Sequence, residues 1–249
     1  MSERSERTRA PASPRVVSLV PSVTETLLAW GVTPVACTRF CEQPDLPHVG
    51  GTKDPDVDAI VALAPDLVVM CVEENRREDA EALAAAGVRT ASLSIDGLAD
   101  VPPALRMLAG LTGAGAAAAE GVTAADAAVG EPLPTRLRAF VPIWKRPWMT
   151  LAAGTYGSSL LASVGVANVF ADATTRYPTV TLDEVRARRP DVVLAPSEPY
   201  PFAERHVPLF DEVAPVILVD GQDLFWWGAR TAGARIRLAA QLGDVLPPA

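Results

Sequence analysis

Short apolar runs and amphipathic segments alternate along the chain from residue 15 onward. The β-branched run "RVVSLV" (15–20) is typical of a buried strand, and "PSVTETLLAWG" after it has the pattern of a short helix that ends at Gly31. The same order recurs in residues 56–111, with helical "DVDAIVALA", strand "PDLVVMC", helical "REDAEALAAAG", strand "VRTASLSI" and mostly helical "LADVPPALRMLAGL". This alternation predicts an α/β fold with mainly parallel sheets.

Residues 113–134 differ from the rest of the chain, because they are rich in alanine and contain no strand signal. Alanine is the best helix former, and glycine and proline lie mainly near the ends, so a helix is favoured over a flexible linker. After Pro134 the alternation resumes, with strands at 136–143 and 148–153 and a helix at 156–165. The prediction is therefore two α/β lobes, residues 15–112 and 135–249, joined by a single long connecting helix at 113–134. Residues 1–14 are predicted to be a disordered tail.

Two segments repeat without a gap, 125 positions apart. "DAIVALAPDLVVMCVEEN" begins at Asp58 and "DEVRARRPDVVLAPSEPY" begins at Asp183, and the identical pairs include Asp58/Asp183, Pro65/Pro190, Asp66/Asp191 and Glu73/Glu198. Each copy predicts an N-capped helix, a Pro-Asp turn, an apolar strand and an acidic loop. Because the copies flank the connecting helix, they favour two similar lobes.

Candidate ligand-binding residues follow the predicted strands, since ligands of open parallel sheets gather at the carboxyl ends of the strands. Four of the five tryptophans and all three tyrosines come after residue 143. Such aromatics suit the walls of a site for a large, flat, partly apolar ligand, although some of them can equally pack the core. Arginines near them either pair with ligand carboxylates or phosphates or form surface ion pairs. The candidates are Pro21, Phe40, Thr52, Lys53, Trp144, Tyr156, Arg176, Tyr177, Tyr200, Trp226, Trp227 and Arg230.

Charge and cysteine content exclude several classes of protein. A formal net charge of −8 and a pI near 4.9 argue against a nucleic-acid partner. Three cysteines are an odd number, which favours free thiols over a disulfide framework. Cys37 and Cys41 lie near His48, but no fourth ligand is evident, so no metal site is predicted.

No catalytic motif is evident in the sequence. The two histidines, His48 and His206, lie in different halves, and a capping or solvated role is favoured for His206. "AGTYGSS" (153–159) lacks the lysine of a phosphate loop, and no "GxSxG" elbow occurs. The sequence therefore predicts a binding protein and not an enzyme.

Four segments resemble the helical-backbone (class III) solute-binding proteins, the cobalamin- and ferric-siderophore-binding receptors of ABC importers. They are "RVVSLVPSVTETLLAWG", "VGGTKDPDVDAIVALAPDLVV", "RYPTVTLDEVRARRPDVVL" and "WWGAR". The resemblance covers Arg15 to Leu242 and implies two lobes that hold a cobalamin, a haem-like group or a ferric siderophore between them. It places Pro21 and Phe40 at first-lobe contacts and Trp226, Trp227 and Arg230 at second-lobe contacts. Thr52 and Lys53 stand where the family has a tryptophan.

The resemblance also implies a partner. Receptors of this family dock on an ABC permease through an acidic residue on each lobe, and Glu73 and Glu198 are the candidate pair, with Glu78, Glu81 and Glu204 as alternatives. A small metal chelate and an ABC permease are the expected partners of a monomer without membrane insertion.

The N-terminus is charged and polar, without the apolar segment of a secretory signal. The sequence as written therefore predicts a cytoplasmic protein, whereas a start codon farther upstream would allow an extracytoplasmic one. The alternative function is a cytosolic chelate-processing enzyme, or a corrinoid or metal-chelate carrier, on the same scaffold without a role in transport.

Overall fold

Two parallel four-stranded sheets form the centre of the protein. The computed structural model describes residues 13–130 and 132–243. The first sheet has the order β2-β1-β3-β4 and the second β10-β9-β5-β7, and every strand pair within them is parallel. Their strands are β1 (Val16–Ser18), β2 (Ala36–Cys37), β3 (Leu67–Cys71), β4 (Thr90–Leu93), β5 (Leu137–Phe140), β7 (Val166–Asn168), β9 (Val192–Pro196) and β10 (Val216–Val219). The predicted α/β class with mainly parallel sheets is confirmed.

Helices connect successive strands of both sheets. They are α1 (Pro21–Ala29), α2 (Val57–Ala62), α3 (Arg77–Ala85), α4 (Val101–Thr112), α5 (Ala116–Ala128), α6 (Tyr156–Ala162), α7 (Leu182–Ala187), α8 (Gly221–Phe225) and α9 (Thr231–Leu242), with short 3₁₀ helices at Leu98–Asp100 and Glu204–Phe210. The strand predicted at 148–153 is only β6 (Trp148–Met149), which pairs antiparallel with β8 (Thr179–Val180). Of the predicted tail at 1–14, all but the last two residues lie outside the described residues.

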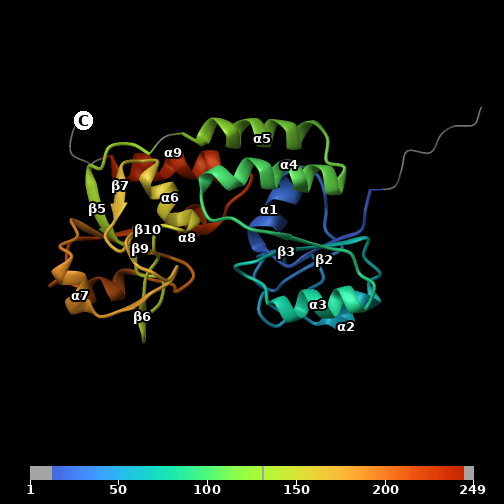
Figure 1. Ribbon diagram of the computed structural model, residues 1–249, viewed down its shortest axis with the longest axis horizontal. Helices are drawn as coiled ribbons and strands as arrows, with labels where there is room; N and C mark the ends of the chain where they lie inside the picture. Colours follow the sequence, from blue (N-terminus) through green and yellow to red (C-terminus); the bar gives the residue numbers. More distant parts are fainter. Residues whose placement is uncertain (1–12, 131, 244–249) are drawn as a thin grey trace, which may run out of the picture.

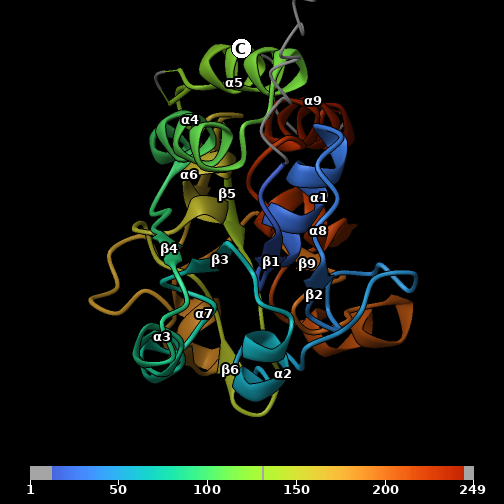
Figure 2. The same cartoon turned by 90° about the vertical axis from the view of Figure 1, so that its right-hand side faces the viewer.

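The two sheets belong to two lobes that lie side by side, with the N-terminal lobe in blue to teal in Figure 1. Helices α4, α5 and α9 lie along one side of the molecule in both views, and α2 and α3 lie at the other (Figures 1 and 2).

The predicted connecting helix corresponds to α5, which occupies the middle of residues 113–134. A turn at Gly113, whose φ of +68° suits glycine, reverses the chain after α4, so that α4 and α5 pack side by side (Figure 1). Helix α5 also packs against α9. A second helix, α4, therefore supports the connection between the lobes.

One hydrophobic core runs through both lobes. Buried side chains of β3, α4 and α6, such as Val69, Leu105 and Leu160, belong to the same cluster as Trp227. The outer face of each sheet has a core of its own, around Ile60 in the first lobe and Phe140 in the second. Because protein cores are close-packed, a core shared by both lobes restricts their relative movement.

The 125-residue repeat is visible in the structure. The bounds of α2 and β3 differ from those of α7 and β9 by 125 at both ends. The N-caps of the two helices are Asp56 and Thr181, two residues before Asp58 and Asp183, and each side chain accepts a backbone hydrogen bond. The predicted order of capped helix, turn and apolar strand is thus confirmed in both lobes.

Candidate functional site

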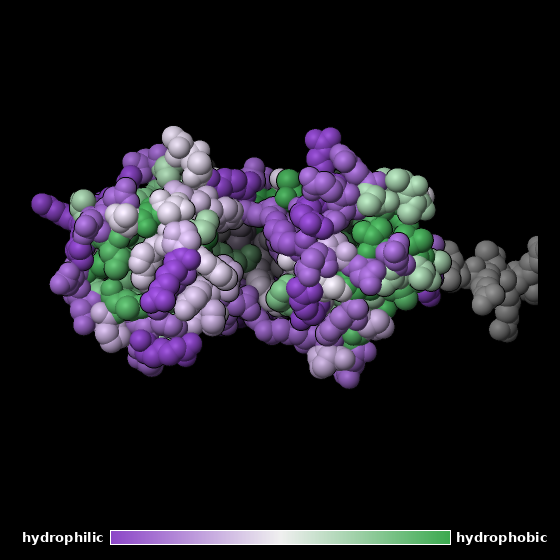
Figure 3. Space-filling model, turned by 90° about the horizontal axis from the view of Figure 1, so that it is seen from below, coloured by the Kyte–Doolittle hydropathy of each residue, from purple (hydrophilic) through white to green (hydrophobic). Residues whose placement is uncertain are grey.

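The carboxyl ends of the two sheets meet across the gap between the lobes. Side chains that follow β2, β3 and β4 bond to side chains that follow β7 and β10. Figure 3 views the molecule from the side opposite α5 and shows a hollow between the lobes, hydrophilic on its first-lobe rim. Ligands of open parallel sheets bind at this edge, so the hollow is the candidate site.

Arg176 connects the lobes on one side of the hollow. Its guanidinium donates to Glu73 Oε1 at 3.1 Å and to Asp96 Oδ1 at 2.5 Å. The hydroxyl of Tyr177 donates to the same oxygen of Glu73, and burial together with that carboxylate raises the pKa of the hydroxyl. Arg176 and Tyr177, both predicted ligand residues, are thus engaged by acids of the first lobe.

Gln222 of α8 makes a second connection. Its Nε2 donates to Glu42 Oε2 at 2.9 Å and lies 3.5 Å from Glu198 Oε1, while the indole of Trp226 donates to Glu198 Oε2 at 3.0 Å. Burial raises the pKa of the Glu198 carboxyl, and these two donors oppose that shift. Gly221 is required here, because a side chain at this position would collide with the backbone of Glu198.

Arg230 makes a third connection, from the second lobe to α1. It donates to Glu25 Oε1 at 2.6 Å and to Asp223 Oδ1 at 2.8 Å, and lies 5.4 Å from the ring centre of Trp226. The bonds to Glu25 raise the pKa of the guanidinium. The nearby Arg237 also binds Asp223 and lowers the pKa of its carboxyl. Arg230 is therefore an anchor between the lobes.

A cavity of about 710 Å³ lies at the carboxyl ends of β9 and β10, and Glu42 of the first lobe completes its wall. Phe202, Leu218 and Val219 form its apolar part. This combination of an apolar wall with a few polar groups is typical of small-molecule sites.

Exposed apolar side chains occupy the carboxyl edges of both sheets. Phe40 follows β2 and is 51 % exposed, and Trp144 follows β5 and is 45 % exposed. Trp144 packs edge-on against Tyr200 at 5.6 Å between ring centres. Val72, directly after β3, is 63 % exposed. Large apolar side chains are therefore available to a ligand from both lobes.

Three other predicted ligand residues are buried. Tyr156 bonds to Thr231 through its hydroxyl, at 3.1 Å, and Trp227 belongs to the shared core. Pro21 is the buried first residue of α1. Of the two adjacent tryptophans, the half-buried Trp226 is the one that bonds to a cleft residue.

Thr52 and Lys53 are held against the loop that follows β3. Lys53 Nζ donates to the carbonyl of Glu73 at 2.8 Å, and Asn75 Nδ2 donates to the carbonyls of Thr52 and Leu19. The buried Asn75 thus ties together three loops of the first lobe. The sequence analysis missed it, because a lone asparagine after a strand carries no distinctive signal.

Glu74 is a second residue that the sequence analysis missed. Burial raises the pKa of its carboxyl to about 7, and the negative charges of Glu73 and Cys41 add to the shift, whereas Lys53 opposes it. The adjacent Glu73 is visible in the sequence, but the burial of Glu74 and the approach of Cys41 and Lys53 arise only in the fold.

The three cysteines are free and buried, as predicted. The hydroxyls of Thr24 and Thr38 each lie 3.2 Å from Cys41 Sγ. A hydrogen bond with Cys37, together with these hydroxyls, lowers the pKa of Cys41 to about 6, and the pKa of Cys37 is raised. Within the described residues, no three histidine, cysteine or acidic side chains are grouped to hold a metal ion.

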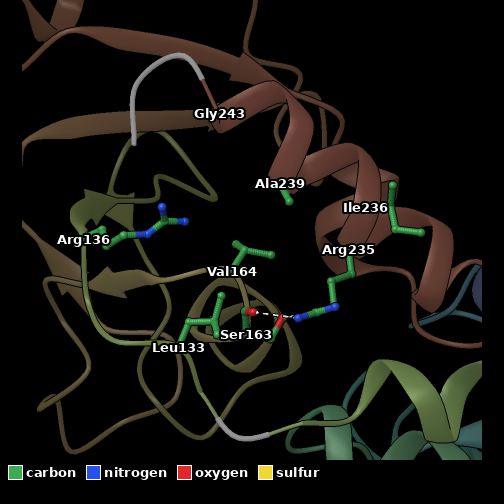
Figure 4. A pocket seen from close by; sticks show the side chains of 8 residues that line it. All are labelled: Leu133, Arg136, Ser163, Val164, Arg235, Ile236, Ala239 and Gly243. Carbon is green, nitrogen blue, oxygen red and sulfur yellow. Dashed lines mark hydrogen bonds between the residues drawn. The ribbon is translucent and has the colours of Figure 1, made fainter. Parts of the chain in front are cut away.

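A smaller cavity of about 300 Å³ lies elsewhere in the second lobe, between α9 and the segment that leads into β5 (Figure 4). Arg235 crosses it to bond to Ser163, with Nη2 3.2 Å from the carbonyl oxygen. The cavity lies at the amino end of β5, the edge opposite the hollow, so it is not part of the candidate site.

Residues 16–203 match the sequence model of a family described as periplasmic binding protein. The chain belongs to the periplasmic binding protein family. The match covers more than half of the sequence and confirms the predicted solute-binding class and the predicted non-enzymatic nature of the protein.

Among related sequences, this binding protein is 27 % identical over 240 residues to the vitamin B12-binding protein of Pectobacterium carotovorum. That alignment covers 91 % of this chain and 86 % of the relative. The chain is 28 % identical over 192 residues to the vitamin B12-binding protein of Salmonella typhimurium, in an alignment that covers 74 % of this chain and 72 % of the relative.

Solved structures share the fold. The periplasmic vitamin B12 binding protein BtuF of Vibrio cholerae has a TM-score of 0.78 at 19 % identity, over 93 % of this chain and 97 % of that one. The periplasmic heme-binding protein BhuT, in complex with two hemes, has a TM-score of 0.79 at 21 % identity, over 95 % of this chain and all of that one. At these identities the likeness establishes the two-lobed fold alone.

No helix in the described part of this periplasmic binding protein is both long and apolar enough to cross a membrane.

Proposed function

We propose that this protein binds a cobalamin, a haem-like group or a ferric siderophore in the cleft between its lobes. The observation that carries the proposal is the position of Phe40 and Trp144, two exposed aromatic side chains at the carboxyl edges of opposite lobes. Exposed aromatic surface at the carboxyl edges of both lobes suits a flat ligand with apolar faces. Relatives named for vitamin B12 binding and neighbours named for heme binding support this ligand class.

The cleft is largely preformed. The shared core limits movement of the lobes, and polar bonds, such as Arg176 to Glu73 and Gln222 to Glu42, join them across the hollow. A ligand can replace such bonds without unpacking the core. Preorganisation of this kind lowers the entropic cost of binding.

Isothermal titration calorimetry with cyanocobalamin, haemin and a ferric siderophore tests the proposal. We expect one of these ligands to bind at a single site and to raise the melting temperature. The variants Phe40→Ala and Trp144→Ala should each weaken binding by about tenfold, since an aromatic contact contributes about 1 kcal/mol beyond its buried area. Glu81→Gln, an exposed change on α3, is the matched control. Absence of binding by all three ligands up to about 100 µM would contradict the proposal.

We further propose that the protein delivers its ligand to an ABC permease through acidic side chains on each lobe. Glu73 and Glu198, the predicted pair, both take part in side-chain bonds at the cleft. Glu78 and Glu204, one on each lobe, are exposed and are the better candidates. With the cognate permease in nanodiscs, charge reversal at Glu78, which does not line the 710 Å³ cavity, should abolish stimulation of ATP hydrolysis while ligand affinity is retained.

Import requires that the protein meets its ligand outside the cytoplasmic membrane. Cell fractionation of the native host, with an antibody against the protein, tests this location. The alternative of a chelate-processing enzyme gains no support from His206, which is buried and accepts a bond from the backbone of Ala203.

A further inference from the structure

The charged residues that line the 710 Å³ cavity are all acidic. They are Glu42 from the first lobe and Glu198, Glu204 and Asp220 from the second, and no lysine or arginine is among the described lining residues. Glu42 and Glu198 bond to uncharged donors, the amide of Gln222 and the indole of Trp226, so their negative charge is not neutralised there.

The two arginines that connect the lobes beside the hollow are already engaged. Arg176 lies between two carboxylates, Glu73 and Asp96, which gives that group a net negative charge. Arg230 bonds to Glu25 and Asp223. An anionic ligand would therefore have to displace an existing carboxylate to pair with either arginine.

Lys53 does not make the first-lobe side of the cleft positively charged. Its ammonium donates to the backbone carbonyl of Glu73 at 2.8 Å, and the side chain lies beside Glu73 and Glu74. Burial is the largest cause of the raised pKa of Glu74, and repulsion from Glu73, Cys41 and Glu198 adds to it, which agrees with a negative potential at the first-lobe side of the cleft.

We infer that the cleft selects neutral or cationic chelates whose rim carries N–H donors, and discriminates against chelates that carry carboxylate or catecholate charges. The inference rests on the proposed function and specifies the charge of its ligand. The reason is electrostatic: carboxylates in a partly buried cleft accept bonds from carboxamide or ammonium groups and repel like charges.

A ligand pair that differs mainly in charge tests this inference, and a second pair differs both in charge and in its iron-binding groups. Cyanocobalamin is compared with its monocarboxylic acid, in which one carboxamide is replaced by carboxylate, and cationic ferrioxamine B with anionic ferric enterobactin; haemin supplies a dicarboxylate. At about pH 8 and low salt, we expect the dissociation constant of the anionic ligand to be at least about tenfold higher than that of its partner, in whichever pair binds to the protein. The ratio should shrink in about 0.5 M NaCl, which screens charges.

Variants then assign the effect to the cavity. Glu42→Gln and Glu198→Gln keep an acceptor for the same donors but remove the charge, so each should reduce the discrimination ratio. Glu120→Gln, an exposed change on α5 at the side opposite the hollow, removes the same charge and should leave the ratio unchanged. Circular dichroism and melting temperature confirm that each variant is folded.

The outcomes separate the inference from the proposed function. Equal affinity for cyanocobalamin and its monocarboxylic acid, or tight binding of haemin or ferric enterobactin, would overturn the charge selection while leaving chelate binding intact. Binding of none of these ligands would overturn the proposed function, and the inference with it.

Discussion

Asp66 and Asp191 make the same hydrogen bond in the two lobes. Each Oδ2 accepts from a backbone N–H at 2.7 Å, that of Arg15 just before β1 and that of Arg138 within β5. Both arginines in turn donate to carbonyls at the end of the helix that precedes the aspartate. The repeat therefore extends from the sequence to individual bonds that join neighbouring strands.

The aspartates should contribute about equally to stability. Asp66→Ala and Asp191→Ala each remove a charge-assisted bond at an exposed position, and we expect each to lower the free energy of unfolding by about 1 kcal/mol. Urea denaturation measures the effect, with Asp45→Ala in an exposed loop as the control. A clear loss in one variant and none in the other would show that the two bonds are not equivalent.

The repeat also shows how much of the fold the sequence predicts. The apolar strand after Pro65 and its copy after Pro190 fix the placement of β3 and β9 in the centre of each sheet, because a short apolar run without polar positions must be buried on both faces. The turn at Gly113 was not foreseen, since glycine within an alanine-rich segment is compatible with either a continuous helix or a break.

The contacts and the burial of the candidate-site residues were less predictable from the sequence. The sequence places Arg176 after a strand, but its partner Glu73 is 103 positions away, and no local pattern shows that the two meet. Likewise, Trp226 and Trp227 are adjacent, and only the packing of the shared core decides that Trp227 is buried. Long-range pairing and burial within a short loop depend on the tertiary structure, which periodicity does not encode.

Truncation of Trp227 should mainly reduce stability, whereas truncation of Trp144 should mainly reduce ligand affinity. Trp227 is 3 % exposed, so Trp227→Ala should lower the free energy of unfolding by about 3–5 kcal/mol. Trp144 is 45 % exposed, so Trp144→Ala should change stability by less than about 1 kcal/mol and act mainly on ligand affinity. Thermal denaturation and calorimetric titration of both variants check the contrast, and a large loss of stability in Trp144→Ala would argue against its role as a ligand contact.

The bond between Arg176 and Glu73 should contribute little to the stability of the free protein. The two side chains are 39 % and 26 % exposed, and pairs of this kind typically contribute about 0.2–1 kcal/mol. A double-mutant cycle with Glu73→Gln and Arg176→Gln measures the coupling energy, which should fall further at high salt. A coupling well above about 2 kcal/mol would mean that the bond locks the lobes together.

Gly121 of α5 should be intolerant of alanine. A Cβ atom there would lie 2.8 Å from Trp30 Nε1, so the buried indole would have to shift, and we expect Gly121→Ala to destabilise the protein by about 1–3 kcal/mol. Gly110 of α4 is the matched control, since nothing lies within 4 Å of its Cβ position. Gly110→Ala should stabilise the protein by about 0.5–1 kcal/mol through helix propensity. Equal effects of the two changes on urea denaturation would contradict this packing argument.

Glu74 should make stability depend on pH. Burial raises the pKa of its carboxyl from 4.5 to about 7, so between these values the folded protein binds more protons than the unfolded chain. Stability contributed by the neutral carboxyl is therefore fully present below about pH 4.5 and is lost as the pH rises through about 7. Glu74→Gln cannot ionise, so it should exceed the parent in stability by about 3 kcal/mol at pH 8 and nearly match it at pH 4.5. Urea denaturation of both proteins across this range measures the difference.

The contribution of Cys41 to this titration can be tested separately. Negative charge on Cys41 is one cause of the raised pKa of Glu74, so the stability gained by Glu74→Gln at pH 8 should be smaller in a Cys41→Ser background than in the parent. Comparing the gain within each background cancels the titration of Cys41 itself. The serine hydroxyl can still bond to Thr24 and Thr38, which keeps the local packing. If the gain from Glu74→Gln is the same in both backgrounds, burial and the acids of the cleft alone account for the shift. For the single variant Glu74→Gln, a stability at pH 8 no higher than that of the parent would mean that the folded protein ionises this carboxyl without losing stability, which contradicts the raised pKa.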